Sequence, residues 1–341
     1  MITTDVLVIG AGPSGTVAAA IIKQAGFDVR IVEKQQFPRF VIGESLLPRC
    51  LEALDEAGFM DALNAQNFQV KAGAKFIRNG EICDFTFEKQ HTGGWRYAWQ
   101  MPRADFDLTL ANECERKGIP IAYKHEVTAI EIADDGSSIT TIKPEEGEAY
   151  QIKARFIVDG SGYGRVIPRL FNLEKPSSQP ARKTVFAHMT DPRRLEQEEP
   201  NRIVVYVHRD DCWVWTIPFS NGNTSVGYVS NPEFFEKYTG TLEEQFRGMV
   251  ADEPALQQRV GEAELIFEPR VLQGWSATTD TFWGKGFILT GNVTEFLDPI
   301  FSSGVTLATV SAQTAAKLVI RHLNGETVDF QKEYTGPTMQ G

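Results

Sequence analysis

The sequence predicts an α/β protein in which a Rossmann-type dinucleotide-binding domain is assembled from separate segments of the chain. Strand and helix patterns alternate over the first third, β-rich alternation fills residues 183–275, and a buried-strand pattern returns at Gly286–Thr290. Alternating strands and helices are typical of a parallel sheet with crossover helices, whereas consecutive strands favour a mixed or antiparallel sheet. We therefore expect a discontinuous first domain with an inserted second domain of mixed and antiparallel β-structure.

The expected elements follow from apolar runs and from helical spacing. In the first domain, strands are expected at Val6–Ile9, Val29–Val32, Gly73–Arg78, Ile121–Tyr123, Val127–Ile132 and Arg155–Asp159. Helices are expected there at Thr16–Ala25, Leu46–Ala57, Asp105–Lys117 and Thr306–Leu323. In the inserted domain, strands are expected at Ile203–His208, Cys212–Ile217 and Ser225–Val229, with a helix at Leu242–Val250.

The domain boundaries are placed where these patterns change. Residues 1–78, 101–182 and 276–325 are assigned to the discontinuous dinucleotide-binding domain, and residues 79–100 and 183–275 to the inserted substrate domain. Residues 326–341 are expected to be the start of a further C-terminal element that is truncated.

The charge of the chain narrows the classes of partner. The 341 residues carry a formal net charge of −11, which argues against nucleic acid and anionic membranes, since both select basic surfaces. No apolar run reaches the roughly 18 residues that a membrane span needs. A strand is expected almost at the N-terminus, which leaves no room for a signal peptide, so we predict a cytoplasmic protein.

Cysteine and histidine are too scattered for a disulfide framework or a metal centre. The 4 cysteines include no C-x-x-C pair, and no two of the 5 histidines fall at a spacing typical of metal ligands. We therefore expect buried free thiols and no metal site.

A glycine motif directly after the first expected strand is the most specific local signal. Gly10, Gly12 and Gly15 form G-x-G-x-x-G. Gly10 permits the tight turn, Gly12 lets the backbone approach a pyrophosphate, and Gly15 lets the helix sit close to the sheet. Glu33 ends the second strand, where a carboxylate can accept both ribose hydroxyls. Together these features predict a bound dinucleotide without distinguishing FAD from NAD.

Three later segments bear on the identity of the dinucleotide. They are Arg103–Asp107 at the start of a helix, Asp159-Gly160 after a strand, and Gly291-Asn292 late in the chain. With these segments the whole chain resembles the p-hydroxybenzoate-hydroxylase-like flavoproteins, which implies FAD as the cofactor and an FAD-binding first domain. In that superfamily the late pair is usually Gly-Asp, whereas Asn292 carries no charge. One dinucleotide fingerprint is present, so a separate NAD(P)H domain is not expected.

Four further segments narrow the family. Gly43-Glu44-Ser45 lies within R-F-V-I-G-E-S-L-L-P, Lys71 lies in V-K-A-G-A-K-F, Trp213–Pro218 reads W-V-W-T-I-P, and residues 298–305 read D-P-I-F-S-S-G-V. In this order they resemble the flavin-dependent halogenases, particularly the branch that acts on phenolic, pyrrolic or carrier-tethered substrates. Tryptophan-directed members carry a glutamate in the segment matching residues 300–303, where this chain has Phe301, which argues against free tryptophan as the substrate.

The resemblance implies a set of residues that contact FAD. These are Gly10, Gly12, Pro13, Ser14, Gly15, Glu33, Lys34, Arg39, Glu44, Ser45, Arg103, Val127, Asp159, Gly160, Gly291, Asn292, Pro299, Gly304 and Val305. It also places halide, chloride or bromide, on the backbone N–H groups of Ser303 and Gly304. The free N–H groups and positive dipole end of the helix expected from Thr306 suit an anion. Plain capping of that helix by serine is the alternative interpretation.

The resemblance further implies a catalytic lysine and an aromatic shield. Lys71 is expected to take up or hydrogen-bond hypohalous acid, which requires an amine that is partly desolvated so that its pKa falls. Lys75 is the competing candidate. Trp213, Trp215 and Phe301 are expected to lie between the flavin and the organic substrate. The two indoles alternate along a strand and so share one face, which an aromatic core would also explain.

These observations predict an FAD-dependent oxidoreductase that resembles the halogenases. Reduced flavin, oxygen and halide would give an electrophilic halogen, delivered to a phenolic, pyrrolic or carrier-tethered aromatic substrate, and a separate flavin reductase would supply the reduced flavin. An FAD-dependent hydroxylase (monooxygenase) and a double-bond reductase similar to geranylgeranyl reductase stay open as alternatives. A flavin-binding protein without turnover is a third, because of Asn292 and the abrupt C-terminus.

Overall fold

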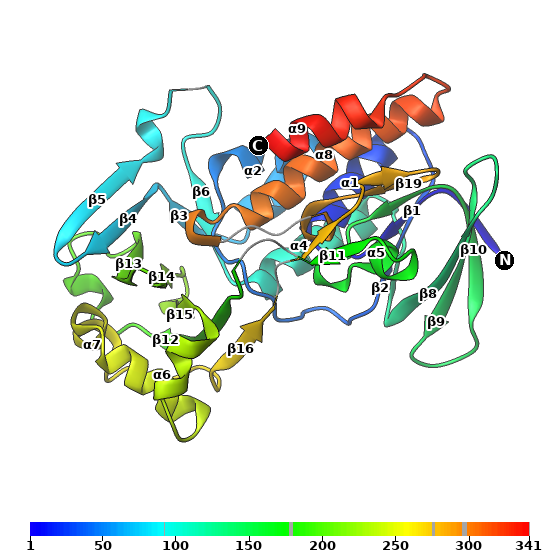
Figure 1. Cartoon of the computed structure of the whole chain (residues 1–341). Coiled ribbons are helices and arrows are strands. Elements are labelled where there is room, and N and C mark those ends of the chain that lie inside the picture. The colour runs from blue at the N-terminus through cyan, green and yellow to red at the C-terminus, as the bar shows by residue number, and fades with distance from the viewer. Residues whose placement is uncertain (92, 177–179, 275–276, 295–298, 341) are drawn as a thin grey trace.

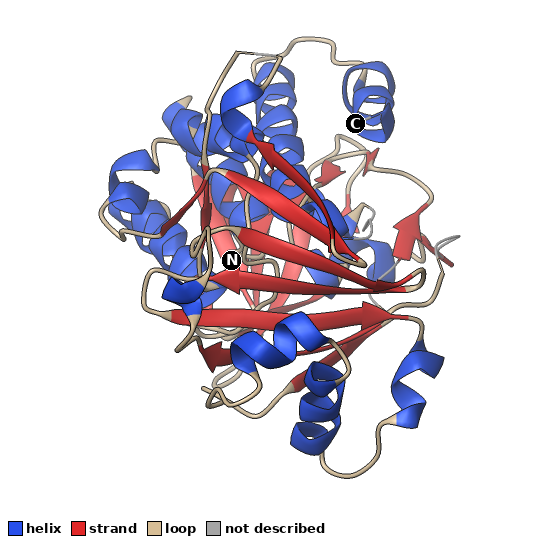
Figure 2. Ribbon diagram, turned by 90° about the vertical axis from the view of Figure 1, so that its left-hand side faces the viewer, coloured by secondary structure: helices blue, strands red, loops and turns tan. Residues whose placement is uncertain are grey.

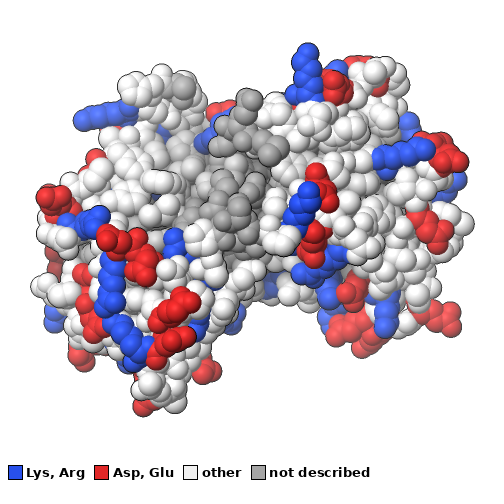
Figure 3. Space-filling view, in the orientation of Figure 1, with Lys and Arg blue, Asp and Glu red and all other residues white. Residues whose placement is uncertain are grey.

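The computed structural model describes residues 1–91, 93–176, 180–274, 277–294 and 299–340. An 8-stranded sheet and a 7-stranded sheet form two lobes of the molecule (Figure 1). Figure 2 shows the strands in the middle and groups of helices on either side of them. Lys and Arg side chains intermingle with Asp and Glu over the face drawn in Figure 3. No helix within the described residues combines the length and apolarity of a membrane span.

The first sheet has the strand order β18-β19-β10-β1-β2-β7. Its strands are β1 (Ile2–Ile9), β2 (Val29–Glu33), β7 (Ile121–Tyr123), β10 (Tyr150–Asp159), β18 (Trp283–Gly284) and β19 (Phe287–Leu289). β1 pairs in parallel with β2 and β10, and β19 pairs in parallel with β10. β8 (His125–Ile132) and β9 (Ser138–Pro144) add an antiparallel extension along the first half of β10.

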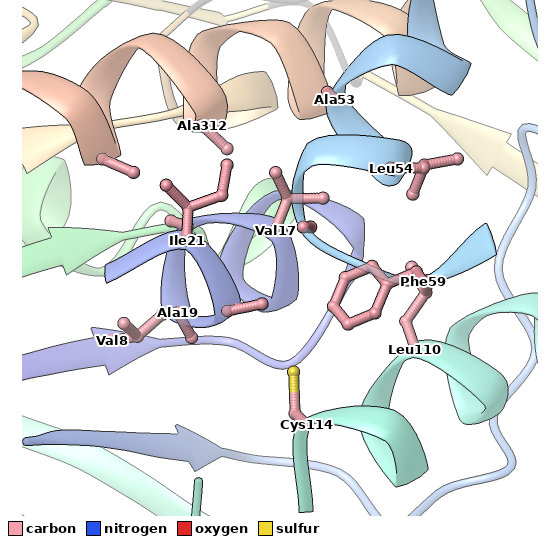
Figure 4. Close-up of a cluster of buried hydrophobic side chains, with 14 of the residues drawn as sticks. Val8, Val17, Ala19, Ile21, Ala53, Leu54, Phe59, Leu110, Cys114 and Ala312 are labelled. Atoms are coloured by element: carbon pink, nitrogen blue, oxygen red, sulfur yellow. The ribbon is translucent and has the colours of Figure 1, made fainter. Parts of the chain in front are cut away.

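Helices cover this sheet and bury small side chains between them. They are α1 (Pro13–Gln24), α2 (Pro48–Glu56), α3 (Met60–Asn64), α4 (Arg103–Arg116), α5 (Val166–Leu170) and α8 (Gly304–Leu323). Figure 4 shows Val17 and Ile21 pointing from α1 toward Ala312 of α8. All three side chains are buried, and alanine on the facing surfaces of α1 and α8 lets the helices pack closely. This packing holds the N-terminal ends of both helices near the carboxyl ends of the strands.

The second sheet has the order β16-β12-β15-β14-β13-β4-β5. Its strands are β4 (Gly73–Arg78), β5 (Glu81–Thr86), β12 (Lys183–Thr190), β13 (Ile203–Arg209), β14 (Cys212–Pro218), β15 (Asn223–Ser230) and β16 (Arg270–Gln273). Helices α6 (Leu242–Ala251) and α7 (Pro254–Val260) cover one face, and α6 begins with a capping box formed by Thr241 and Glu244. The other face carries Trp213, Trp215 and Ile217.

The domain boundary expected after residue 78 does not coincide with the division of the chain between the two sheets. β4 was assigned to the first domain, but it pairs in parallel with β13 and antiparallel with β5 in the second sheet. Asn79 and Gly80 both have positive φ, 50° and 84°, as a tight hairpin turn requires. The Asn-Gly pair therefore joins β4 and β5 into one hairpin, which a boundary at residue 78 divides. The sequence patterns also did not predict the strands β5, β9, β12, β16 and β18 of the two sheets.

Two short pairings and a C-terminal segment complete the chain. β3 (Gln69–Lys71) pairs with β6 (Ala98–Gln100), and β11 (Glu174–Pro176) pairs with β17 (Ala277–Thr279). After α8 the chain forms a π-helical turn, Gln331–Thr335, and α9 (Gly336–Gln340). The Tyr334 side chain is buried and its hydroxyl donates to the Leu289 carbonyl at 2.6 Å. This segment therefore packs against the first sheet.

The cysteines are free, as the sequence predicts, but they are not all buried. Cys50, Cys114 and Cys212 are buried, whereas Cys83 is exposed. Cys83 lies on β5, the edge strand of the second sheet, and most of this strand faces solvent. In the described ranges no group of three or more His, Cys, Asp or Glu side chains is arranged to hold a metal ion.

Candidate active site

A cavity of about 700 Å³ is lined by residues of both sheets. The turn after β1 and the N-terminal ends of α1 and α8 line it on one side. Residues 39–45 and 160–164 and side chains of β12, β13 and β14 line it elsewhere. In sheets of this kind ligands bind outside the carboxyl ends of the parallel strands. The cavity therefore lies where the dinucleotide is expected.

The turn after β1 is glycine-rich because backbone segments meet there. Gly10 has a φ of +93°, and a Cβ atom at this position would lie 2.7 Å from the Gly160 carbonyl oxygen. A Cβ atom on Gly15 would lie 1.9 Å from the carbonyl oxygen of Gly10. α1 then begins at Pro13 with no acidic residue in its first turn. The positive end of this helix faces the cavity and suits a pyrophosphate.

Glu33 is held in place by two backbone donors. Its Oε2 accepts from the Ala11 N–H at 2.8 Å, and its Oε1 accepts from the Gln35 N–H at 2.8 Å. Each oxygen of an ionised carboxylate has a second lone pair. Because Glu33 lines the cavity, it can also accept the hydroxyls of a ribose, as FAD requires.

A buried carboxylate, Asp107, positions two arginines on the cavity wall. Arg103 forms a two-point ion pair with it, Nε to Oδ1 at 2.8 Å and Nη2 to Oδ2 at 3.1 Å. Arg39 approaches the same carboxylate at 3.4 Å. Arg103 also donates from Nη1 to the carbonyls of Ile42 and Gly43, so it fixes the segment that leads to Glu44. Both guanidinium groups line the cavity and can offer N–H donors to a phosphate.

The cavity gathers most of the residues predicted to contact FAD. Those that line it are Gly10, Gly12, Pro13, Ser14, Glu33, Lys34, Arg39, Glu44, Ser45, Arg103, Gly160, Asn292, Gly304 and Val305. The cavity wall does not include Gly15, Val127, Asp159 or Gly291. Pro299 belongs to the short helical turn Pro299–Phe301, and the preceding Asp298 falls outside the described residues.

Asp159 and Val127 have structural places instead of cavity positions. The Asp159 carboxylate accepts from the N–H groups of Ser161, at 3.0 Å, and Ile167, at 2.8 Å, and burial raises its pKa. It thereby shapes the turn that presents Gly160. Val127 lies in an apolar cluster beneath the first sheet.

Lys71 is buried in a largely apolar site. It lies on β3, with 2% of its surface exposed, and its Nζ donates to the Leu46 carbonyl at 2.9 Å. Burial lowers the pKa of Lys71 to about 7. Lys75 pairs with Glu199 at 2.8 Å instead, and this partner raises its pKa. Lys71 is therefore the desolvated amine of the two. Lys71 and Leu46 do not line the cavity, whereas Glu44 and Ser45, the two residues before Leu46, do.

The two indoles of β14 line the cavity, whereas Phe301 does not. Trp213 and Trp215 lie with ring centroids 5.9 Å apart, and the Trp215 Nε1 donates to the Ser225 hydroxyl at 2.9 Å. Phe301 is 63% exposed and lies against Phe76. Phe301 therefore does not lie where it could shield the flavin, as was expected. The short turn directs its neighbour Ile300 into the cavity instead.

The N-terminus of α8 opens toward the cavity. Ser303 is the N-cap residue, but its side chain forms no cap hydrogen bond and the first turn contains no acidic residue. The first N–H groups of a helix have no partner within the helix. Ser302 and Gly304 line the cavity while Ser303 does not. The serine-capping alternative is therefore wrong for Ser303, and the turn can offer N–H groups to an anion.

A buried His–Glu pair beside the cavity was not predicted from the sequence. The His188 Nε2 lies 2.6 Å from the Glu44 Oε1, and both side chains are buried. The imidazole also contacts the rings of Phe40, Phe219 and Phe267. An isolated histidine in a strand gives no sequence signal for such a pair, because its partner is distant in the chain. Asp107, which lies inside a quoted motif, could have been found from its spacing of four residues to Arg103.

Replacing His188 with Leu is expected to destabilise the protein by roughly 3–5 kcal/mol, because it leaves a buried carboxyl group without its partner. Denaturant unfolding measures this loss. His208→Leu is the matched control, since its partner Glu253, at 2.9 Å, keeps 18% of its side chain exposed and can be hydrated. Equal losses in the two variants would contradict the role given to burial of Glu44.

Comparison with known proteins agrees with this geometry. The family model described as FAD binding domain matches residues 3–328. A flavoprotein/dehydrogenase from Cytophaga hutchinsonii, known as a crystal structure, superposes with a TM-score of 0.96 at 53% identity, covering 99% of this chain and 83% of that one. The myxobacterial chondrochloren halogenase superposes with a TM-score of 0.89 at 29% identity, over 98% and 78% of the two chains. The fold and the cavity thus define an FAD-dependent oxidoreductase.

Curated relatives of the chain are named as halogenases. It is 30% identical to tryptophan 2-halogenase of Chondromyces crocatus over 98% of its own length and 65% of that protein. It is 28% identical to the 1H-pyrrole-2-carbonyl-[peptidyl-carrier protein] chlorinase of Pseudomonas fluorescens, over 96% of this chain and 78% of the other. The chain belongs to the FAD-binding-domain family, with FAD as its cofactor. Over nearly all of its length it is similar to flavin-dependent halogenases, and it spans about two thirds to four fifths of these proteins.

Proposed function

We propose that the protein halogenates a phenolic, pyrrolic or carrier-tethered aromatic substrate with chloride or bromide. The observation that carries this proposal is the buried amine of Lys71, whose pKa is lowered to about 7, next to a segment that lines the FAD cavity. A hydroxylase or a dehydrogenase has no need for a desolvated amine at this place. The pyrrole chlorinase among the relatives supports the substrate class.

Several parts of the site contribute to this reaction. FAD, when bound and reduced, supplies the activation of oxygen that oxidises a halide. Gly12, Pro13 and Ser14 hold the pyrophosphate, and the N–H groups at the start of α8 hold the halide. Trp213 and Trp215 keep the organic substrate away from the reactive end of the flavin. The neutral amine of Lys71 binds the hypohalous acid that leaves the cavity and directs it to the substrate.

The partners of this reaction follow from the same features. The described residues form one glycine-rich dinucleotide-binding turn, after β1, so a separate reductase would supply reduced flavin. The resemblance to the halogenases implies a glutamate in this segment of tryptophan-directed members, where this chain has Phe301, which favours a substrate other than free tryptophan. Since a 30% identical relative is named a tryptophan halogenase, tryptophan belongs among the compounds tested.

A second candidate function is a halide-independent oxidation or reduction. It is favoured by one observation: the Cytophaga hutchinsonii protein, at 53% identity, is described as a flavoprotein/dehydrogenase.

Mass spectrometry of products separates the two functions. The protein would be incubated with FAD, a flavin reductase, oxygen and a panel of phenols, pyrroles and tryptophan, with chloride, with bromide or without halide. We expect a product that carries the isotope pattern of the halogen supplied. A product that forms equally without halide, as a hydroxylated, dehydrogenated or reduced compound, would replace halogenation by the corresponding alternative.

A further inference from the structure

The His188–Glu44 pair connects a ring that reaches solvent with a carboxylate at the cavity wall. Among the residues that the structure describes, Glu44 lines the cavity and His188 does not. The Glu44 side chain is fully buried, whereas 11% of the His188 side chain is exposed. Because His188 is not part of the cavity wall, the exposed part of its ring faces solvent outside the cavity. The contact of 2.6 Å between Nε2 and Oε1 therefore joins the two regions.

The apolar surroundings of the imidazole direct it toward the carboxylate. Its ring centroid lies 5.7, 5.1 and 4.8 Å from those of Phe40, Phe219 and Phe267. Phe267 belongs to a largely exposed segment, in which the Ile266 N–H donates to the His188 carbonyl at 2.8 Å. This segment places the histidine just below the surface of the molecule.

Two arginines are the charged neighbours of the pair. Arg103 interacts electrostatically with Glu44, and the Arg270 guanidinium lies over two of the phenylalanine rings that contact His188, at 4.2 and 4.8 Å. An arginine stays protonated in a protein, whereas an imidazole can donate and accept a proton through its two nitrogens. Of these neighbours, His188 is the one that can exchange a proton with Glu44.

The second oxygen of Glu44 has no hydrogen-bond partner within the described residues. This atom, Oε2, is buried, and buried polar atoms are normally paired. The backbone around it is fixed, because the Met101 N–H donates to the Glu44 carbonyl at 3.0 Å and Arg103 donates to the Gly43 carbonyl at 3.3 Å. A Cβ atom on Gly43 would lie 3.7 Å from Cγ2 of Val305, in the first turn of α8. The unpaired oxygen thus belongs to the part of the site where halide is expected.

The proposed reaction consumes a proton in this part of the site. Oxidation of one halide ion by one O2 and neutral reduced flavin gives hypohalous acid, one water and oxidised flavin. The halide and the flavin lose two electrons each, and the oxygen molecule gains all four. The products hold three hydrogens, of which two come from the reduced flavin. The third hydrogen must enter the cavity as a proton from solvent.

We propose that His188 and Glu44 form a proton relay from solvent to the cavity. The Glu44 carboxyl gives the proton from its unpaired oxygen to the oxygen of the product, so one O–H bond breaks and another forms. His188 then passes a proton from Nε2 to Oε1 and regains one from water. This inference rests on the proposed function, because halide oxidation is the step that consumes the proton. A shared proton also keeps the net charge of the pair at zero beside a bound halide.

The midpoint potential of the bound flavin tests the pair without halide or substrate. His188→Gln keeps an amide that can donate to Glu44 but shares no proton with it, so the carboxylate stays charged. A buried negative charge near the flavin disfavours the electron-rich reduced form, and the midpoint potential should fall. His208→Gln is the matched control, because its partner Glu253 does not line the cavity, and it should leave the potential unchanged. Equal potentials in His188→Gln and the unmodified protein would overturn the proposal.

Rescue by imidazole tests the proton transfer itself. In His188→Ala the rate of hypohalous acid formation, measured by trapping with a small phenol, should fall about 100-fold. Added imidazole should restore most of this rate, and a series of substituted imidazoles should restore it in the order of their basicity. A restoration that does not follow basicity, or loss of FAD from both His188 variants, would make the pair a structural support and overturn the relay. Absence of halide oxidation in the unmodified protein, with a lowered potential in His188→Gln, would count against the proposed function alone.

Discussion

Replacing Lys71 with Met is expected to abolish halogenation and, at the same time, to stabilise the folded protein. The rate of halogenated product formation should fall by on the order of 100-fold or more, since no amine remains to bind the hypohalous acid and direct it to the substrate. The free energy of unfolding should rise by roughly 1–3 kcal/mol, because methionine fills the same space without the cost of burying a charge. Product mass spectrometry and denaturant unfolding measure the two effects, and FAD binding should be unchanged.

The gain in stability should depend on pH in a defined direction. The pKa of Lys71 is about 7 in the folded protein against an ordinary value of 10.5. Between these values the unfolded chain binds more protons than the folded one, so the stability contributed by this site rises with pH. The gain in the free energy of unfolding from Lys71→Met is therefore largest below pH 7 and disappears as the pH rises to about 10.5. The halogenation rate of the unmodified protein should rise as the pH passes through about 7, because the neutral amine is the reactive form.

Lys75→Met is the control for both effects. Lys75 forms an ion pair with Glu199, so its removal should bring no gain in stability and should leave halogenation in place. Should Lys71→Met be less stable than the unmodified protein, or keep its halogenation activity, the role assigned to the buried amine would be wrong.

Replacing Gly12 with Val is expected to remove FAD almost completely while the fold persists. A Cβ atom at Gly12 would meet only the Arg39 Nη2, at 3.4 Å, and its φ of −72° and ψ of −178° are open to any residue. The protein itself therefore tolerates a side chain here. A pyrophosphate does not, because it must approach the backbone at this point.

The measurement combines flavin absorbance of the purified variant with circular dichroism. Gly15→Ala is the contrasting variant, since its Cβ atom would lie 1.9 Å from the carbonyl oxygen of Gly10, and we expect it to lose folded structure along with FAD. Full flavin occupancy in Gly12→Val would show that the turn after β1 does not bind the pyrophosphate of FAD.

Local patterns predicted the fold and the dinucleotide turn well. β1, α1, β2 and the glycines between them depend on neighbours in sequence, so alternation and glycine spacing were sufficient to find them. Lys71 was predicted by resemblance, because one lysine among many carries no local mark of burial. The pairing of His188 with Glu44 was not predicted, since it joins residues distant in the chain. Phe301 was misplaced because a short helical turn decides which of two adjacent side chains enters the cavity.

The chain path through the two sheets has a consequence for how the molecule is assembled. Ala74 pairs with Ile203 in the second sheet, and Ile157 pairs with Phe287 in the first. The chain segment between the first two partners, residues 74–203, overlaps the segment between the second two, residues 157–287. Synthesis from the N-terminus therefore completes the second sheet while the first still lacks β19 and α8. Closing such long loops costs chain entropy before any contact repays it. Neither lobe consists of one continuous segment of the chain. We therefore expect the two lobes to fold and unfold together.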